Sequence, residues 1–146
     1  MWCVAWHPNG NLLASCGADK SIMLWSRDGG CVATLDDVHS RTVRRLAWSP
    51  NGRYLAAASF DGTCSVWSKD QDDGKLNFRA VVAYCFNRFT NKAEFDCIAT
   101  LEGHENEVKG VAWSAESAQL ATCGRDKTVW IWEGNDAIDA VVCLNA

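Results

Sequence analysis

Residues 101–133 read LEGHENEVKGVAWSAESAQLATCGRDKTVWIWE, and this stretch decides the fold. The pair Gly103-His104 opens it, and short apolar runs follow, separated by polar residues. Asp126 lies in the polar turn between the second and third runs, and Trp132 ends the third run. Short runs rich in β-branched and aromatic residues, divided by turn residues, predict antiparallel strands. The stretch therefore predicts one small antiparallel β unit.

The same pattern occurs twice more along the chain. The tripeptide Val-Ala-Trp that begins at Val4 recurs as Leu-Ala-Trp from Leu46 and as Val-Ala-Trp from Val111. The first offset is 42 residues, which lies within the period typical of WD40 repeats, the units of a β-propeller. The second offset is 65 residues. We therefore expect an insertion between the second and third repeats.

Each repeat contains four predicted strands, so the chain is predicted to be all-β with three four-stranded antiparallel blades. The predicted strands are residues 2–6, 12–16, 21–25 and 31–35, then 42–48, 54–58, 63–67 and 97–101, then 107–113, 119–123, 128–132 and 140–144. We assign residues 1–35 to blade one, 36–101 to blade two with the insertion at about 68–95, and 102–146 to blade three. Three blades cannot close a ring of the usual four to eight. We expect an open WD40 propeller fragment of a longer product, with apolar faces uncovered at both ends.

The first turn of each repeat is less uniform than the strands. Asn9-Gly10 and Asn51-Gly52 predict two-residue hairpins, because Gly and Asn tolerate a positive φ. The third repeat has Ala115-Glu116-Ser117 at this place. We therefore expect a looser turn in blade three.

Histidine, hydroxyl and carboxylate side chains recur at fixed places in the repeats. In blade three they predict a buried chain in which Asp126 accepts from His104, His104 meets Thr122, and the Trp132 indole reaches the same hydroxyl. Blade two has Ala57 where the hydroxyl belongs, and blade one lacks the His. The predicted network residues are Ser15, Asp19 and Trp25, then His39, Asp61 and Trp67, then His104, Thr122, Asp126 and Trp132.

A hydrolase is the alternative interpretation of the same residue types, with Thr122 as nucleophile, His104 as base and Asp126 as the orienting carboxylate. A nucleophile must be accessible to substrate, so burial of Thr122 would exclude this interpretation. Repetition of the pattern with partial loss favours a structural network instead. We predict no catalytic residues.

Candidate partner-binding residues lie beside the turns. Phe60 and Arg125 directly precede the turn aspartates of blades two and three, and large aromatic and Arg side chains are the types that anchor protein interfaces. Arg41, Glu105 and Glu107 lie in the loops that lead into the first strands and are secondary candidates.

Composition excludes several function classes. The 146 residues carry a formal net charge of −4, which lacks the basic excess that favours nucleic acid or anionic membranes. The eight cysteines form no C-x-x-C pair and have no His at zinc-finger spacing, so we expect buried reduced thiols, no metal site and no cofactor. We predict neither nucleic-acid nor membrane binding. The predicted location is the cytoplasm, with the nucleus as a second compartment.

Two strings carry a closer resemblance. Residues 42–50 (TVRRLAWSP) and the stretch from Leu101, above all LEGHENEVK and the Arg-Asp-Lys turn at Arg125, resemble the WD40 proteins of cytosolic iron–sulfur protein assembly. The resemblance covers nearly the whole chain except about residues 75–93, and it extends only to the first three of that family's seven repeats. By position, Arg125 matches a rim turn of the family.

The resemblance implies a seven-bladed, non-enzymatic scaffold in the complex that delivers iron–sulfur clusters to cytosolic and nuclear apo-proteins. The implied partners are a small MIP18-type subunit, a HEAT-repeat adaptor and the iron–sulfur apo-proteins. The alternatives are an unrelated WD40 adaptor, in ubiquitin ligation or chromatin, or a non-functional truncated fragment, because fold alone does not fix function.

Overall fold

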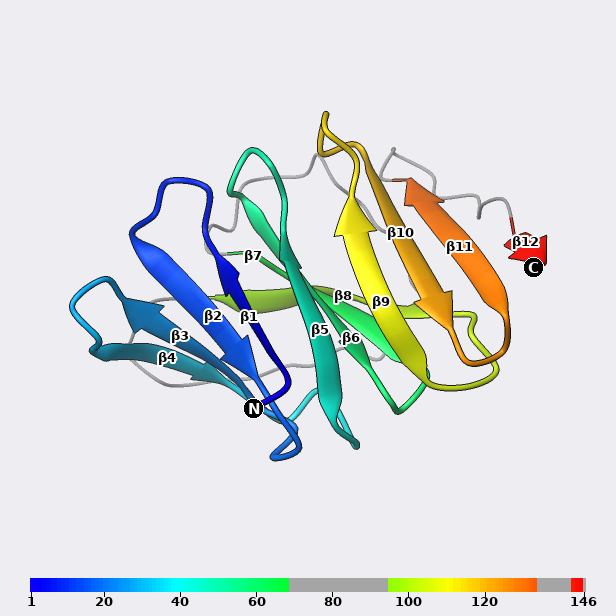
Figure 1. Cartoon of the computed structure of the whole chain (residues 1–146), viewed down its shortest axis with the longest axis horizontal. Helices are drawn as coiled ribbons and strands as arrows, with labels where there is room; N and C mark the ends of the chain where they lie inside the picture. Colours follow the sequence, from blue (N-terminus) through cyan, green and yellow to red (C-terminus); the bar gives the residue numbers. More distant parts are fainter. Residues whose placement is uncertain (69–94, 134–142, 146) are drawn as a thin grey trace.

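The computed structural model describes residues 1–68, 95–133 and 143–145 of the chain. Within these ranges, twelve strands form three separate four-stranded antiparallel sheets. The sheets lie next to one another in one row, in the order in which they occur along the chain (Figure 1). The first sheet contains β1 (Cys3–Trp6), β2 (Leu12–Cys16), β3 (Ile22–Ser26) and β4 (Cys31–Leu35). The second contains β5 (Val43–Trp48), β6 (Tyr54–Ser59), β7 (Thr63–Ser68) and β8 (Asp96–Glu102). The third contains β9 (Val108–Trp113), β10 (Gln119–Gly124), β11 (Thr128–Glu133) and β12 (Cys143–Asn145).

The three sheets confirm the prediction of an all-β, open set of three four-stranded blades, and we call them blades one, two and three. Strands β1 to β11 begin and end within one residue of the predicted bounds. The exception is β12, for which residues 140–144 were expected; of these, 140–142 lie outside the described residues. The predicted insertion between β7 and β8 also lies outside them, over residues 69–94. No helix long and apolar enough to cross a membrane occurs in the described part of the chain.

The first strands of the three blades, β1, β5 and β9, lie side by side (Figure 1). Each step from one blade to the next carries the same hydrogen bond. The Trp48 indole N–H on β5 donates to the Ala5 carbonyl on β1 at 3.1 Å, and the Trp113 indole on β9 donates to the Ala47 carbonyl on β5 at 3.1 Å. The repeated Ala-Trp pairs of the sequence are therefore joined across blade boundaries.

Two apolar cores fill the spaces between the blades. Leu24 of blade one packs in a cluster with Leu55 of blade two, and Val66 of blade two packs in a second cluster with Leu120 of blade three. Blade two thus contributes to both cores and is buried on both faces, which explains why β6 and β7 lack the alternating pattern of a half-exposed strand.

The first turn of each blade departs from prediction in two ways. Gly10 and Gly52 have positive φ values of 73° and 72°, as expected, but the loops are longer than two residues, since His7 N–H donates to the Leu12 carbonyl across residues 8–11. The prediction of a looser turn in blade three is also wrong. Ser117 takes φ 58° there, and its N–H donates to the Ser114 carbonyl at 3.0 Å, as Gly10 and Gly52 do in their own turns.

Candidate functional site

Blade three contains a continuous chain of buried polar contacts. His104 Nδ1 lies 2.8 Å from Asp126 Oδ2, and His104 Nε2 lies 2.9 Å from Thr122 Oγ1. The Trp132 indole N–H donates to the same Thr122 oxygen at 2.9 Å. Because an ionised carboxylate only accepts, the bond between these two side chains is donated by Nδ1 of His104. Every polar side-chain atom of this network in blade three thus has a partner.

Blade two contains the same hydrogen-bond network, but the hydroxyl comes from a different position. His39 Nδ1 lies 3.0 Å from Asp61 Oδ2, while His39 Nε2 lies 2.8 Å from Ser65 Oγ, which also accepts from the Trp67 indole at 2.8 Å. The sequence indicated a missing hydroxyl in this blade because Ala57 occupies the expected place. That interpretation was wrong, since Ser65 on β7 is the direct cross-strand partner of Ala57 on β6 and supplies the oxygen.

Blade one retains only the last hydrogen bond of this network, the one between the indole and the hydroxyl. The Trp25 indole donates to Ser15 Oγ at 2.8 Å, and Ser15 is buried. Asp19 lies in the matching turn but is exposed, and the place of the network His, 22 residues before the Asp in the other two blades, falls before Met1. The structure therefore brings Ser15 and Trp25 together without Asp19.

A threonine that sequence reasoning missed completes each full network. Thr128 Oγ1 donates to Asp126 Oδ1 at 2.8 Å, and Thr128 N–H donates to the same oxygen at 3.0 Å. Thr63 makes both contacts with Asp61, at 2.7 and 3.0 Å. The signal was present as Asp-x-Thr in both turns, a spacing that allows the Asp side chain to bond the backbone two residues on.

These contacts hold both aspartates ionised. Burial alone would raise the pKa of Asp126, but the hydrogen bonds from Thr128 and His104 outweigh it and lower that pKa to about 2. Burial opposes the shift at Asp61 as well, yet the bonds from His39 and Thr63 lower its pKa well below the usual range. Each carboxylate thus anchors the loop that leads into the first strand of its own blade, since Asp61 accepts from Ser40 N–H and Asp126 accepts from Glu105 N–H.

The geometry of the network contradicts the hydrolase interpretation. Thr122 is 2% exposed, and its oxygen already contacts both His104 and Trp132. A substrate carbonyl could not approach a hydroxyl enclosed in this way. His104, Thr122 and Asp126 therefore form a structural unit of the blade.

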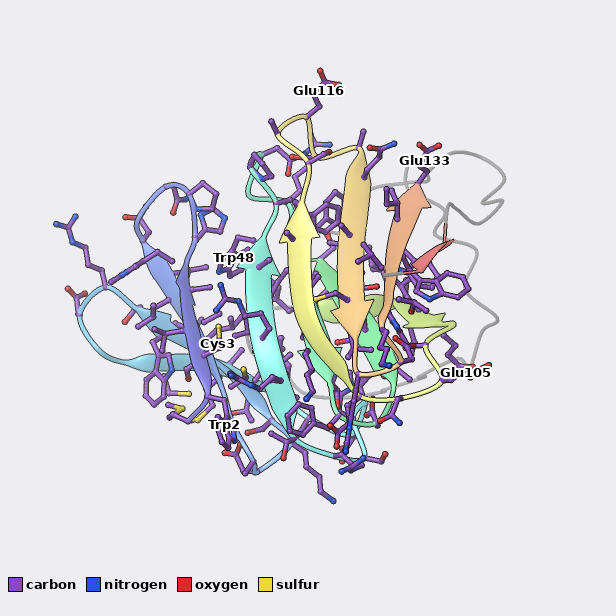
Figure 2. The ribbon with its side chains drawn as sticks, turned by 45° about the vertical axis from the view of Figure 1, so that its right-hand side comes forward. Trp2, Cys3, Trp48, Glu105, Glu116 and Glu133 are labelled. Atoms are coloured by element: carbon purple, nitrogen blue, oxygen red, sulfur yellow. The ribbon has the colours of Figure 1, made fainter. Side chains whose placement is uncertain are left out.

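The turn aspartates define one rim of the molecule, which we call the Asp-turn rim. It contains the β2–β3, β6–β7 and β10–β11 turns and the loops that lead into β5 and β9. Figure 2 shows Glu105 at this end of blade three and Glu116 at the opposite end. The backbone N–H of Glu105 donates to Asp126 at 3.0 Å, so the loop and the turn are joined.

A cationic cluster lies on the Asp-turn rim between blades two and three. Glu107 is at its centre, with Arg41 Nη2 at 3.2 Å, Arg125 Nη1 at 3.8 Å and Lys109 Nζ at 3.9 Å from its carboxylate oxygens. The Arg41 and Arg125 side chains remain 57% and 64% exposed, whereas Glu107 is 14% exposed. One carboxylate thus holds three cations, and the rim presents two guanidinium groups to solvent.

The remaining candidates lie around this cluster. Phe60 is half-buried, and its backbone carbonyl accepts from Arg41 Nη1 at 2.8 Å. Glu105 is exposed on the neighbouring loop. Glu107 differs from the exposed contact residue that the sequence suggested, because it lies beneath the cations and positions them. Its central role could not be read from the sequence, since Arg41 and Glu107 are 66 residues apart.

The cysteines are only partly the buried thiols that were expected. Cys3, Cys16 and Cys64 are buried, but Cys31 and Cys123 are exposed. Burial raises the pKa of Cys16 to about 12 and that of Cys64 further, so both remain protonated thiols. Among the described residues, no three His, Cys, Asp or Glu side chains gather as a metal site would require.

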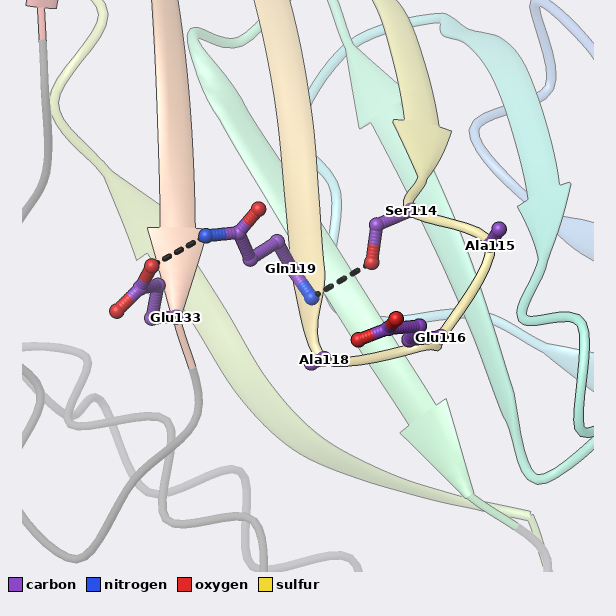
Figure 3. Close-up of a pocket in the computed structure, with 6 residues that line it drawn as sticks. All are labelled: Ser114, Ala115, Glu116, Ala118, Gln119 and Glu133. Atoms are coloured by element: carbon purple, nitrogen blue, oxygen red, sulfur yellow. Dashed lines mark hydrogen bonds between the residues drawn. The ribbon is translucent and has the colours of Figure 1, made fainter.

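An open hollow lies at the other end of blade three (Figure 3). Gln119 crosses it, with its backbone N–H donating to Ser114 Oγ at 3.1 Å and its side-chain amide donating to Glu133. Glu116 lies on the loop that borders it. The hollow is shallow and is bordered by the β9–β10 loop and the end of β11, away from the networks and the cationic cluster.

Comparison with known families gives one match over most of the chain. The family described as "WD domain, G-beta repeat" matches residues 1–26, 29–68 and 95–133. The second match covers β4 to β7, and the third covers β8 to β11. Each of these sequence repeats therefore begins with the last strand of one blade and continues into the next, which ties neighbouring blades together.

Curated relatives are similar over nearly the full chain. A Caenorhabditis elegans protein named "Probable cytosolic iron-sulfur protein assembly protein CIAO1 homolog" is 39% identical over 97% of this chain and 38% of its own length. A "Probable cytosolic Fe-S cluster assembly factor" of Schizosaccharomyces japonicus is 42% identical over 91% of this chain and 19% of its own length. A Mycosarcoma maydis "Probable cytosolic iron-sulfur protein assembly protein 1" is 41% identical over 90% of this chain and 34% of its own length. This chain thus spans well under half the length of each of these relatives.

Solved structures agree on the fold. The structure of U3-55K superimposes with a TM-score of 0.75 at 22% identity, and that of the RRP9 WD40 repeats does so with 0.75 at 23%. Each comparison covers 99% of this chain and 38% of the other. At this identity the likeness extends to the propeller architecture alone.

Proposed function

Because this chain belongs to the WD40 repeat family, we propose that it is a non-enzymatic, protein-binding scaffold of cytosolic iron–sulfur protein assembly. Its role is to help deliver iron–sulfur clusters to cytosolic and nuclear apo-proteins. The partners we propose are a MIP18-type subunit, a HEAT-repeat adaptor and the apo-proteins themselves. The compartment is the cytoplasm, with nuclear presence as part of the same proposal.

The observation that carries this proposal is the identity of about 40% to relatives named as cytosolic iron–sulfur assembly proteins, over 90% or more of this chain. The solved structures at 22–23% identity share the fold without approaching this level. Since WD40 propellers serve many unrelated functions, the sequence likeness and not the fold supports the iron–sulfur assignment.

The Asp-turn rim supports a binding role. Arg41 and Arg125 are more than half exposed and are held by Glu107, and Arg41 also donates to the Phe60 carbonyl. A guanidinium group binds carboxylates through two parallel hydrogen bonds, and Arg and aromatic side chains dominate protein-interface energetics. We therefore propose Arg125, with Phe60 and Arg41, as the partner contact, Glu105 as a neighbour, and Glu107 as the residue that positions both guanidinium groups.

Cluster cargo does not require ligands in this chain. The raised thiol pKa values of Cys16 and Cys64 oppose the deprotonation that iron ligation needs. In the proposed mechanism the chain holds its protein partners in place, and the cluster travels on other subunits. The buried His-Asp networks contribute by fixing the loops that carry Arg41 and Glu105.

The test is affinity purification of the tagged chain from its own cells, followed by mass spectrometry. We expect a MIP18-type subunit and a HEAT-repeat adaptor with the unaltered chain, and at least about tenfold less of both with Arg125→Glu, as charge reversal at an anchor implies. Arg27→Glu is the matched control, because Arg27 is exposed on the opposite rim of blade one. Equal recovery with both variants would remove Arg125 from the contact. Absence of these partners from the unaltered chain would refute the scaffold role of this chain and favour the truncated, non-functional fragment.

A further inference from the structure

The cationic cluster carries more positive charge than its carboxylate balances. Arg41 Nη2 and Arg125 Nη1 lie 3.2 and 3.8 Å from the Glu107 oxygens. Lys109 Nζ lies 3.9 Å from the same carboxylate. The three cations come from the loop before β5, the β10–β11 turn and β9, and they meet between blades two and three. One carboxylate balances one of the three charges, so the cluster keeps an excess of two.

Most hydrogen-bond donors of these cations are open to solvent. Arg41 uses two of its five N–H groups, one for the Phe60 carbonyl and one for Glu107. Arg125 and Lys109 approach the carboxylate as ion pairs, without a side-chain hydrogen bond to any residue that the structure describes. The three cationic side chains are 57%, 64% and 49% exposed, whereas Glu107 is 14% exposed. The remaining donors therefore face outward around a half-buried anion.

The backbone holds the cluster in a fixed arrangement. Arg125 N–H donates to the Glu107 carbonyl at 2.8 Å, which joins the turn and the loop of blade three. Phe60 N–H donates to the Thr42 carbonyl at 2.9 Å, and the Phe60 carbonyl accepts from Arg41. Because the backbone under both guanidinium groups is already ordered, a ligand that binds them loses less conformational entropy on binding.

The cluster is not a general feature of the repeat. At the same repeat positions 65 residues earlier, Thr42 occupies the place of Glu107 and Phe60 occupies the place of Arg125. The boundary between blades one and two thus lacks both the central carboxylate and the second guanidinium group. Packing of one blade on the next does not require these side chains, so their meeting at one point favours a binding role.

We propose that the cationic cluster binds the phosphate group of a phosphorylated serine or threonine in a protein partner. A phosphomonoester carries about −1.5 to −2 charges at pH 7 and three acceptor oxygens, which match the excess of two charges and the three cationic side chains. A carboxylate has one charge and two oxygens, and it is matched by a single guanidinium group. The net charge of −4 opposes a long polyanion such as nucleic acid. This inference rests on the proposed function, because it names the chemical group through which the same rim holds a protein partner.

The purified 146-residue chain is titrated with a short fluorescent peptide that carries one phosphoserine among glycines, and binding is measured by fluorescence anisotropy. We expect this peptide to bind at least about tenfold more tightly than the same peptide with Asp or unmodified Ser in its place. Arg125→Ala and Lys109→Ala should each weaken its binding by about tenfold, because each removes a charge-assisted contact. Arg27→Ala removes an exposed guanidinium from the opposite rim of blade one and should leave the affinity unchanged.

Urea unfolding of the same variants separates loss of contact from loss of folding. The Arg125 and Lys109 side chains are half exposed or more and make no hydrogen bond within the described residues, so their Ala variants should keep the unfolding midpoint of the unaltered chain. Equal affinity for the phosphoserine and Asp peptides would overturn the proposal, as would equal losses with Arg27→Ala and Arg125→Ala. A labelled single-stranded oligonucleotide that binds more tightly than the phosphopeptide, and weakens with the same variants, would also overturn it.

The titration contains no other subunit, so its result is separate from the test of the iron–sulfur assignment. Recovery of a MIP18-type subunit by affinity purification, together with no phosphopeptide binding, would keep the proposed function and overturn this inference. Phosphopeptide binding that depends on Arg125 and Lys109, without recovery of that subunit, would keep the phosphate site and refute the assignment.

Discussion

Blades two and three reach the same hydrogen-bond geometry from different sequence positions. In blade three the hydroxyl between His and Trp comes from Thr122 on β10, and in blade two it comes from Ser65 on β7. Ala57 and Ser65 are direct cross-strand partners, so their side chains share one face of the sheet. The blade requires an oxygen at one point in space, between imidazole and indole, and either strand can provide it.

The largest expected effect contrasts the turn aspartates of blades three and one. Asp126→Ala should lower the free energy of unfolding by about 3 kcal/mol, because it removes a buried carboxylate and leaves His104 and Thr128 without their acceptor. Asp19→Ala, at the same repeat position, should cost less than about 0.5 kcal/mol, since Asp19 is exposed. Urea unfolding followed by tryptophan fluorescence measures both. Similar losses would show that the turn, and not the network, sets the cost.

A smaller effect is expected when the hydroxyl of blade two is moved. Ser65→Ala should cost about 2 kcal/mol, because His39 Nε2 and the Trp67 indole lose their common partner in a buried site. Adding Ala57→Ser should recover at least half of this loss. Blade one supports the exchange, since Ser15 occupies the Ala57 position there and accepts from Trp25.

The measurement is a double-mutant cycle by urea unfolding, with Ala57→Ser alone as the control for overpacking. Ala57→Ser alone should destabilise, because Ala57 is fully buried and its site already holds the Ser65 oxygen nearby. Additive losses in the double variant would mean that the strand position of the hydroxyl matters, contrary to the comparison of blades two and three.

The repeat made most of the fold predictable from the sequence. The turn aspartates precede Trp25, Trp67 and Trp132 by the same interval, and that register located the strands to within one residue from β1 to β11. The Ser65 exchange could not be predicted in this way. Position by position along the repeat, Ala57 indicates that the hydroxyl is missing. The replacement hydroxyl of Ser65 lies on the paired strand, at a different position of the repeat.

Tertiary contacts explain the other failures. The turn expected to be loose in blade three closes at Ser117, which adopts a positive φ without being Gly or Asn. Ser117 is buried, and its Oγ accepts from Asn51 N–H of the neighbouring turn at 3.2 Å, which offsets the backbone strain. Glu107 likewise receives its role from Arg41 of another blade. Local sequence patterns contain neither contact.

The smallest expected effect uses acid to test the network of blade three. The pKa of Asp126 is about 2 in the folded protein and 3.8 as its ordinary value. A carboxyl with a lowered folded pKa stabilises the protein above its unfolded pKa, and this stability is lost as the pH falls toward the folded pKa. Its contribution should therefore fall by about 1 kcal/mol between pH 6 and pH 3.

Urea midpoints at pH 6, 4 and 3 measure this slope, and Asp126→Asn is the variant that should reduce it. The slope should not vanish, because Asp61 in blade two also has a lowered pKa and loses stability in the same direction. Asp19→Asn is the matched control in blade one and should keep the full slope, since Asp19 is exposed. If Asp19→Asn reduced the slope as much as Asp126→Asn, the acid sensitivity would come from net charge, and the buried networks of blades two and three would not be its source.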